Sequence, residues 1–325
     1  MSIVDHLSNS TANLFSSVTV DRAPEYRLNN EELSVLADST NARFLPVLDS
    51  QVLVSSSTTG YAVAALTRSI FDAEFHPAGP MIYLGRFNGG HHFAIDIEPA
   101  SSAHTAGHLF GDLRQLAPLL PDTDCALLGY TRAMVHWQRT HRHCGRCGTL
   151  NEARNGGHVM RCTAKDCLRQ QFPRTDPAII VLVENGTRAL FGRQAQWPKA
   201  RYSTIAGFVE PGESAEQAVV REVSEETGVE VVNITYHSSQ PWPFPGTLML
   251  GYHAKAGDTG IRLNDHELDE AKWLSRTEIE TQMRDGTFVP PTPTSISFRL
   301  IETWFNQNAA TPLRVLRKTY SELET

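Results

Sequence analysis

The sequence lacks the features that mark membrane-spanning and secreted proteins. No uninterrupted stretch of about eighteen apolar residues occurs, which excludes an ordinary transmembrane helix. The amino-terminal residues do not combine a basic start with an apolar segment and a cleavage site, so no secretory signal is expected. Cysteine is scarce, with five in 325 residues, which excludes a disulfide-rich scaffold. We therefore expect a cytoplasmic protein with no membrane partner.

A surplus of positive charge is also missing. The chain has 29 Lys and Arg against 36 Asp and Glu, giving a formal net charge of −7. Such a balance repels a polyanion at long range, which disfavours a protein that binds nucleic acid mainly by neutralising phosphates. A phosphorylated substrate must therefore be met by local groups.

The length indicates two or three folded units. Short apolar runs separated by turn residues, followed by apolar residues at helical spacing, predict an α+β module at 44–140. A continuous apolar strand at 178–183 and a long helix at 214–227 predict a mixed α/β domain at 173–310. The remaining segments are a polar, loosely ordered lead-in (1–43), a cysteine-containing segment (141–172) and a carboxyl-terminal tail (311–325).

Periodicity and turn residues place the other expected elements. In the first module these are strands at 44–54, 61–66, 81–84 and 92–97, and two helices between 105 and 141 that separate at Pro121. In the α/β domain they are strands at 189–192, 229–234, 248–253 and 271–274, and a helix at 295–306.

Four of the five cysteines form two closely spaced pairs. Their spacing is C-x2-C, fourteen residues and C-x4-C, which suits a tetrahedral Zn²⁺ site. Four thiolates fill the coordination shell, so a structural zinc is expected rather than a catalytic one. The predicted ligands are Cys144, Cys147, Cys162 and Cys167. Three upstream histidines remain alternative ligands: His136, His141 and His143. The fifth cysteine, Cys125, is expected to be a small buried residue.

This zinc ribbon is expected to join the modules on either side of it. The loop between its two cysteine pairs carries Arg154, Arg161 and His158 against Glu152, which is too little positive charge to favour nucleic-acid binding by the ribbon itself. Zinc binding can contribute about 10 kcal/mol or more to folding in peptide systems. We therefore predict a stabilising role.

A glutamate-rich helix follows, with boundaries that can be read from the sequence. Ser214 and Gln217 form a potential capping box, and Gly228 is placed to end the helix in the left-handed conformation. Glu222, Glu225 and Glu226 are spaced i, i+3 and i+4, so their carboxylates share one face and repel one another. Hard oxygen ligands of this kind predict a Mg²⁺ or Mn²⁺ site that can act on a diphosphate.

The pattern from Gly207 to Val229 contains every fixed position of the Nudix box and therefore resembles the Nudix hydrolases. The resemblance implies an α/β/α sandwich with a mixed sheet, preceded here by the four-cysteine zinc ribbon and the N-terminal α+β module. It makes the three helix glutamates catalytic metal ligands, with Glu226 nearest the chemistry. It adds the carbonyl of Ala206 and the carboxylate of Glu267 as metal ligands, and it gives Glu213 and Arg221 an orienting role.

A second motif, Ser239-Gln-Pro-Trp-Pro-Phe-Pro245, resembles the signature of the NADH pyrophosphatase subfamily, which also joins a four-cysteine ribbon to a Nudix domain. The likeness covers residues 44 to 306. It implies a substrate-binding loop made of Gln240, Pro241, Trp242, Pro243, Phe244, Pro245, Gly246 and Thr247. It also implies substrate contacts from Phe208, Phe172, Arg114 and Ser297. Gly246-Thr247, Ser297 and the wider second knuckle depart from the subfamily pattern, which leaves fine selectivity open. Core packing is the alternative role for Trp242 and Phe244.

The resemblance implies that the protein cleaves the diphosphate of NADH or NAD⁺ into a nicotinamide mononucleotide and AMP, and that it can extend this reaction to an NAD cap on RNA. It also implies a homodimer. A Nudix hydrolase for ADP-ribose or another nucleoside diphosphate derivative is one alternative. An inactive Nudix and zinc-ribbon binding module is another, although the complete set of glutamates argues against it.

Overall fold

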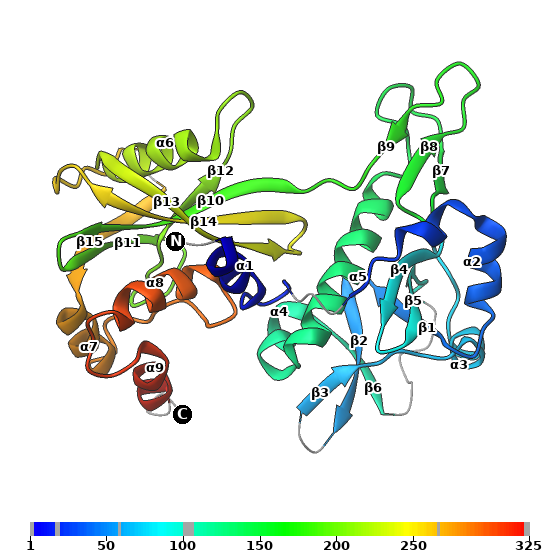
Figure 1. The fold of residues 1–325 in the computed structure, drawn as a ribbon, viewed down its shortest axis with the longest axis horizontal. Coiled ribbons are helices and arrows are strands. Elements are labelled where there is room, and N and C mark those ends of the chain that lie inside the picture. The colour runs from blue at the N-terminus through cyan, green and yellow to red at the C-terminus, as the bar shows by residue number, and fades with distance from the viewer. Residues whose placement is uncertain (1–2, 17–19, 58–59, 100–106, 265–266, 322–325) are drawn as a thin grey trace. The chain divides into compact units, whose positions relative to one another are not determined.

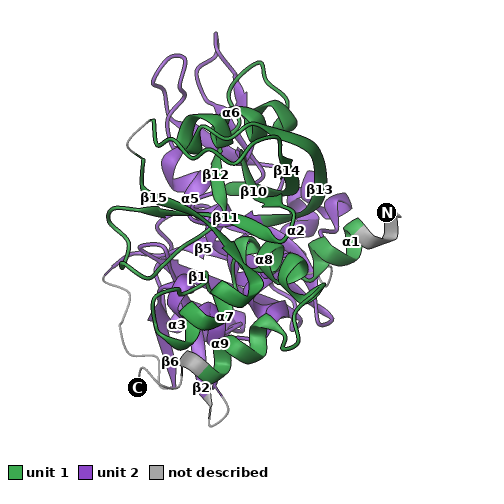
Figure 2. Ribbon diagram, turned by 90° about the vertical axis from the view of Figure 1, so that its left-hand side faces the viewer, with its two compact units in different colours: residues 1–13, 176–240, 247–325 green, residues 14–175, 241–246 purple. Residues whose placement is uncertain are grey.

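A computed structural model describes the chain except for residues 1–2, 17–19, 58–59, 100–106, 265–266 and 322–325 (Figure 1). The chain divides into two compact units (Figure 2). Unit 1 comprises residues 1–13, 176–240 and 247–325, and unit 2 comprises residues 14–175 and 241–246. In the part of the chain that is described, no helix is both long and apolar enough to cross a membrane.

Unit 1 is built on a mixed six-stranded sheet. Strand β10 (Asp176–Asn185) pairs in parallel with β14 (Thr247–Ala256), and antiparallel with β11 (Arg188–Gln194) and β12 (Ile205–Phe208). The sheet order is β13-β14-β10-β11-β15, and its two edge strands are β13 (Val231–Trp242) and β15 (Leu268–Ser275). The apolar run at 178–183 is thus a central strand, as its lack of polar residues predicts.

Helices cover both faces of this sheet (Figure 1). Because side chains alternate along a strand, Ile179 and Val181 pack with Val219 on one face, while Ile180 lies in the cluster on the other. The first face is covered by α6 (Ala215–Thr227); the second is covered by α7 (Arg276–Arg284), α8 (Ile296–Asn306) and α9 (Leu313–Ser321). This is the predicted α/β/α sandwich.

Unit 2 contains a second six-stranded sheet with order β3-β2-β1-β5-β4, in which β6 pairs with β2. Its strands are β1 (Ala42–Leu48), β2 (Gln51–Ser57), β3 (Gly60–Val63), β4 (Ile82–Phe87), β5 (Gly90–Asp96) and β6 (His108–Gly111). The long helix α5 (Asp122–Thr140) packs on one face through Leu127 and Met134. On the other face lie α2 (Asn30–Ala37) and α3 (Arg68–Glu74), through Leu33 and Phe71.

The two ends of the chain are more structured than the sequence pattern suggests. The segment expected to be a loose lead-in contains α1 (Ile3–Thr11), the 3-10 helix η1 (Pro24–Leu28) and α2. The expected tail contains α9, whose Leu313 and Leu316 are buried in the core of unit 1. These helices carry few apolar residues, so their periodicity is too short to predict them.

The segment between 105 and 141 differs in its first part. His108–Gly111 forms β6 instead of helix, followed by the short α4 (Leu113–Leu116) and the 3-10 helix η2 (Ala117–Leu119). Pro121 precedes α5 as predicted, because proline is tolerated at a helix start but not inside a helix. Pairing with β2 explains why Leu109 is extended despite its helical spacing.

The zinc ribbon segment forms a three-stranded sheet in unit 2. Its strands are β7 (Asn151–Arg154), β8 (Val159–Cys162) and β9 (Gln170–Gln171), in the order β7-β8-β9. Met160 and Ala153 pack into the same cluster as α5, so one face of this small sheet is anchored to the helix that precedes it.

Candidate functional site

Helix α6 has the ends that the sequence predicts. The Ser214 Oγ accepts a hydrogen bond from the Gln217 backbone N–H at 3.2 Å, and the Gln217 Oε1 accepts one from the Ser214 N–H at 2.7 Å. Gly228 ends the helix with φ of 69°, a conformation that glycine adopts without steric cost. The capping box and the glycine therefore fix where the glutamates lie along the helix.

The three box glutamates differ sharply in exposure. Glu226 is buried, with 4% of its surface exposed, whereas 12% of the Glu222 side chain and 53% of the Glu225 side chain are exposed. Val219 and Val223 pack against the sheet, and Glu226, seven residues after Val219 and three after Val223, borders this packed face. Around the helix, the exposure of the carboxylates thus falls from Glu225 through Glu222 to Glu226, toward the face that packs on the sheet.

Arg221 links these carboxylates to the loop before the helix. Its guanidinium donates to Glu213 at 2.6 Å, to Glu222 at 2.9 Å and to Glu225 at 3.0 Å. It also donates to the backbone carbonyl of Phe208 at 2.9 Å. The hydrogen bond to Glu213 is the main reason why the pKa of Arg221 lies above its ordinary value. Arg221 and Glu213 therefore orient the loop and the helix.

Gly207 is in direct contact with Glu222. A Cβ atom at residue 207 would lie 1.9 Å from the carboxyl carbon of Glu222, so only glycine leaves room for this carboxylate. Ala206, the preceding residue on β12, pairs with Ile180 of β10. Burial raises the pKa of Glu222 against the opposing effect of Arg221, and the charges of Glu225 and Glu267 add to the rise. The β12 backbone and α6 therefore meet at Glu222, whose pKa also responds to the charge of Glu267.

This contact predicts a large effect from one methyl group. Gly207→Ala should displace the Glu222 carboxylate and lower kcat by about a hundredfold, because small misplacements of catalytic groups have effects of this size. Gly260→Ala is the matched control, since a Cβ atom there meets nothing within 4 Å. The two variants are compared by kcat and melting temperature. A folded Gly207→Ala protein with normal kcat would show that Glu222 does not need this position.

The first residue of the Gln240–Thr247 loop, Gln240, belongs to unit 1 and is buried. Gln240 is 1% exposed, and its amide accepts from the Ile296 N–H at 2.8 Å and donates to the Thr294 carbonyl at 2.8 Å. These bonds attach the end of β13 to the start of α8. Thr247, the first residue of β14, lies opposite Asp176, the first residue of β10. The remaining loop residues, Pro241–Gly246, group with unit 2.

Within unit 2 the loop residues pack against apolar and basic side chains. The Phe244 ring lies 5.8 Å from the Phe15 ring and 5.2 Å from the Trp242 ring. Arg114 and Arg132 lie over Phe244 at 4.5 Å and 4.9 Å, and Arg132 also donates to the Pro243 carbonyl. Trp242 and Phe244 are partly buried beside a core cluster. Packing therefore accounts for much of their surface, and Arg114 is brought to Phe244.

Three other residues implied by the resemblance lie in contrasting environments. Phe208, on β12, is 60% exposed, and so is Phe172, just after β9. Ser297 is 1% exposed, and its Oγ lies 2.9 Å from the Ser203 Oγ and 2.8 Å from the Thr204 Oγ1. Phe208 and Phe172 are thus available for stacking, whereas Ser297 belongs to an internal hydroxyl cluster.

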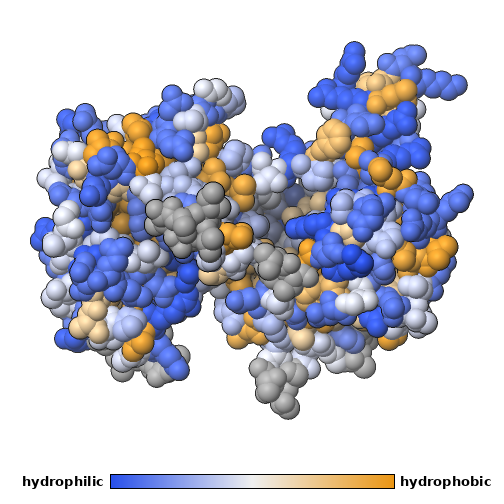
Figure 3. All heavy atoms as spheres, in the orientation of Figure 1, coloured by the Kyte–Doolittle hydropathy of each residue, from blue (hydrophilic) through white to orange (hydrophobic). Residues whose placement is uncertain are grey.

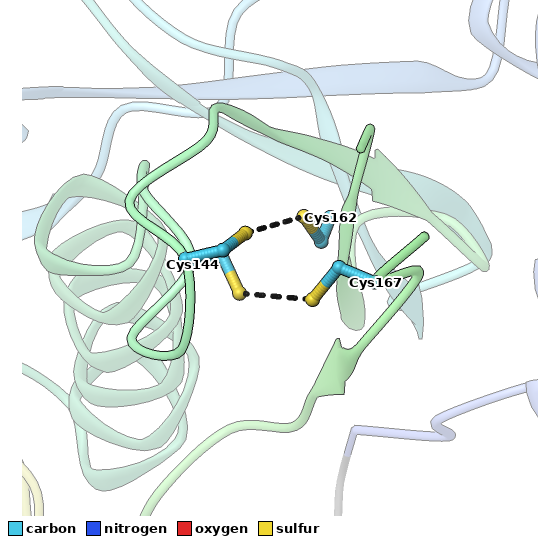
Figure 4. A group of neighbouring side chains, drawn as sticks. Cys144, Cys162 and Cys167 are labelled. Carbon is cyan, nitrogen blue, oxygen red and sulfur yellow. Dashed lines mark hydrogen bonds between the residues drawn. The ribbon is translucent and has the colours of Figure 1, made fainter. Parts of the chain in front are cut away.

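The four cysteines converge as their spacing predicts (Figure 4). Their Sγ atoms all lie within 4.8 Å of one another; Cys144 and Cys167 are 3.8 Å apart, and Cys147 and Cys162 are 3.5 Å apart. A tetrahedral zinc with Zn–S bonds of about 2.3 Å requires sulfur separations near 3.8 Å. The donors therefore fit Zn²⁺. Among the described residues this is the one group of three or more potential side-chain ligands that converges so closely, and it includes no histidine.

Sequence reasoning did not identify two contributors to the site. Arg132 lies 111 residues before the Pro243 carbonyl that it contacts. The contact between Gly207 and Glu222 joins two parts of one motif that spacing alone does not bring together. A single sequence carries no signal for the contact between Arg132 and Pro243. For the contact between Gly207 and Glu222, the fixed glycine of the motif is the only signal.

Comparison with known proteins identifies the domains of the chain. Residues 173–291 match the family model for the NUDIX domain, and residues 41–137 match that for the NADH pyrophosphatase-like rudimentary NUDIX domain. The chain is 42% identical over 193 residues to the NAD-capped RNA hydrolase NudC of Pseudomonas aeruginosa, covering 59% of this chain and 68% of that protein.

Two further relatives extend this similarity. The NAD-capped RNA hydrolase NudC of Stutzerimonas stutzeri is 37% identical over 72% of this chain and 80% of that protein. The human mitochondrial NAD(P)H pyrophosphatase NUDT13 is 37% identical over 63% of this chain and 61% of that protein. With the box glutamates on a capped helix and the cysteines gathered in a ribbon, the chain belongs to the NADH pyrophosphatase subfamily of the Nudix hydrolases.

Proposed function

We propose that this hydrolase cleaves the diphosphate bridge of NADH and NAD⁺ to a nicotinamide mononucleotide and AMP, and that it acts in the same way on NAD-capped RNA. The observation that carries the proposal is the set of graded carboxylates on α6, held by Arg221 and seated against Gly207. The activities of the relatives, NAD-capped RNA hydrolase and NAD(P)H pyrophosphatase, supply the substrate class.

The catalytic metal is proposed to be Mg²⁺ or Mn²⁺. The side-chain donors would be Glu222, Glu225, Glu226 and Glu267, with the carbonyl of Ala206. All of these donors are oxygens, which hard divalent cations prefer. When bound, such cations neutralise phosphate charge and lower the pKa of a coordinated water. The contact of Glu222 with Gly207, next to Ala206, supports this donor set.

The side chains have distinct proposed roles. Glu226, the most buried of the three box glutamates, holds the attacking water or accepts its proton. Arg221 keeps Glu222 and Glu225 in place through its hydrogen bonds. Phe208 presents an exposed ring on which a base can stack without regard to base identity. Together they bind and orient a dinucleotide while the glutamates act at its diphosphate.

The proposed substrate-binding residues lie in two kinds of environment, exposed and buried. Exposed Phe208 and Phe172 are the proposed direct contacts. The buried Gln240 amide and Ser297 hydroxyl are proposed to shape the substrate site by fixing α8 to the end of β13 and to Thr204, just before β12. From Pro241 to Thr247 the loop is proposed to present its backbone to the substrate, with the Trp242 and Phe244 rings packed behind it and Arg114 at Phe244.

The assembly and the cellular location are proposed from family resemblance. We expect a cytoplasmic homodimer, and sedimentation of the purified chain tests the dimer. An ADP-ribose hydrolase is the second candidate for the same glutamates, because ADP-ribose carries the same diphosphate. The complete set of glutamates and their ordered helix disfavour an inactive binding module.

Phe208→Ala tests the stacking proposal. Loss of one base-stacking contact removes roughly 1 to 3 kcal/mol, so kcat/KM for NADH should fall about tenfold to a hundredfold. A small diphosphate substrate without a second base should be affected less. Val232→Ala, at another exposed apolar position of unit 1, is the control. Equal losses for NADH and the small substrate would assign Phe208 to the catalytic loop rather than to base recognition.

Trp242→Ala separates packing from substrate contact. The ring is partly buried beside Phe15 and Phe244, so the variant should lose about 2 to 3 kcal/mol of unfolding free energy, somewhat less than a fully buried aromatic. Its KM for NADH should change by less than about threefold. Thermal unfolding and steady-state kinetics measure the two effects. A large KM increase at unchanged melting temperature would place the ring against substrate.

Product analysis tests the reaction itself. Purified protein with Mg²⁺ or Mn²⁺ and NADH should release reduced nicotinamide mononucleotide and AMP in equal amounts. Reduced nicotinamide together with ADP-ribose would indicate cleavage of the glycosidic bond instead. This product set would reject the proposed function.

A further inference from the structure

The zinc ribbon is a basic segment in an acidic chain. Residues 141–172 contain six Lys and Arg against two Asp and Glu, whereas the whole chain has 29 against 36. The loop between the two cysteine pairs shows little of this excess. Four of the six cations lie instead within or beside the cysteine pairs: Arg142, Arg146, Lys165 and Arg169. Screening limits charge effects to about 8 to 10 Å at physiological salt, so a ligand near the ribbon meets a positive surface in spite of the net charge.

Most of these cations are not neutralised by neighbours. Arg154 pairs with Glu152 at 2.6 Å, and Arg142 lies 3.5 Å from Asp96. The other four form no ion pair with any carboxylate in the described part of the chain: Arg146, Arg161, Lys165 and Arg169. Three of the four are exposed, and Arg161 is half-buried. Figure 3 shows strongly hydrophilic side chains around a few hydrophobic ones over the β7–β9 region.

Strand register places Arg161 on the outer face of the ribbon. On β8, Arg161 lies opposite Glu152 of β7 and Gln170 of β9. The preceding residue of β8, Met160, lies opposite Ala153 of β7. Met160 and Ala153 pack with α5, and neighbouring residues of a strand point to opposite faces. Arg161 therefore points away from α5, on the face that carries Glu152 and Gln170.

We propose that this ribbon surface binds the RNA body of an NAD-capped RNA, an inference that rests on the proposed function. Its ligand class is a single-stranded polyanion. Unpaired cations that come from both knuckles and from a sheet face suit a chain of repeating phosphates better than one small anion. NADH carries no such chain, so the surface contributes to hydrolysis of capped RNA and leaves that of the free dinucleotide unchanged.

The test replaces exposed ribbon cations and an equal number elsewhere. The ribbon variant is Arg146→Gln, Lys165→Gln and Arg169→Gln combined. The control variant combines Lys255→Gln, Arg262→Gln and Lys318→Gln, three exposed cations of unit 1 that also form no ion pair among the described residues. Both variants lose three positive charges. Zinc content and melting temperature are measured for each, and kcat/KM is measured with NADH and with an NAD-capped single-stranded RNA.

The proposal predicts a substrate-specific loss. In the ribbon variant, kcat/KM for capped RNA should fall about tenfold or more at low salt, and the slope of its logarithm against log salt should become shallower by about 2. The NADH value should stay within about twofold, and the control variant should match wild type with both substrates. Equal losses for NADH and RNA, no loss for RNA, or the same RNA loss in the control would each overturn the proposal.

A binding assay keeps this result separate from the fate of the proposed function. Fluorescence anisotropy with an uncapped single-stranded RNA should show binding by wild type that the ribbon variant loses. If wild type fails to hydrolyse NADH and capped RNA, the proposed function fails, and the anisotropy result alone decides whether the surface binds RNA. Poly-glutamate that binds as tightly as RNA would reassign the surface to an acidic protein and overturn the RNA proposal.

Discussion

Glu226→Gln is expected to lower kcat by at least about a hundredfold, which corresponds to roughly 2.7 kcal/mol of transition-state stabilisation. The substitution removes a charge and little volume. Glu226 is buried on α6 next to the face that packs on the sheet, where the nearly isosteric Gln keeps the packing. The melting temperature should therefore change far less than kcat. Both are measured on the same preparation.

The matched control lies on the same helix. Glu216→Gln alters an exposed carboxylate in the first turn of α6 and should leave kcat within about twofold, at a cost of less than about 1 kcal/mol in stability through the helix dipole. Near-normal kcat in a folded Glu226→Gln protein would remove Glu226 from the chemistry. A large loss in both variants would point to damage of the helix as a whole.

Removal of zinc is expected to produce the largest loss of stability. Structural zinc contributes about 10 to 16 kcal/mol in small zinc-binding peptides, and the ribbon is anchored to α5 through Met160, so unit 2 should unfold at a much lower temperature. Mild chelation that removes Mg²⁺ should instead abolish activity and leave the melting temperature unchanged. Readdition of Mg²⁺ should restore turnover.

Two cysteine variants distinguish the roles of the thiols. Cys162→Ser should lower zinc content and melting temperature together, whereas Cys125→Ala should retain full zinc content, because Cys125 is buried in a separate apolar cluster. Thermal unfolding and metal analysis provide both quantities. A zinc-free protein that keeps its melting temperature would contradict the structural role of the ribbon.

Features encoded locally were predictable from the sequence. The capping box of α6 needs only four consecutive residues, and Gly228 ends the helix by its own conformational freedom, so the positions of Glu222, Glu225 and Glu226 follow from spacing. The cysteine pairs are likewise defined by short spacing, and their sulfurs converge in the structure.

Features that depend on distant contacts were not predictable. The hydrogen bond from Arg132 to Pro243 and the packing of Phe15 on Phe244 join residues separated by more than a hundred positions. The chain ends were underestimated because the apolar residues of α2 and α9 become informative only when the core that buries them is known. The sequence identified the candidate reacting groups, whereas the tertiary structure determines how the loop at 240–247 is held.

The central claim is tested most directly by ranking substrates for the unmodified enzyme. Specificity constants should be measured with Mg²⁺ and with Mn²⁺ for NADH, NAD⁺, ADP-ribose, a dinucleoside polyphosphate and NAD-capped RNA. We predict that NADH or NAD-capped RNA ranks first, with cleavage at the diphosphate. A clear preference for ADP-ribose, together with an equal effect of Phe208→Ala on ADP-ribose and NADH, would contradict the dinucleotide assignment and leave a metal-dependent Nudix hydrolase of different specificity.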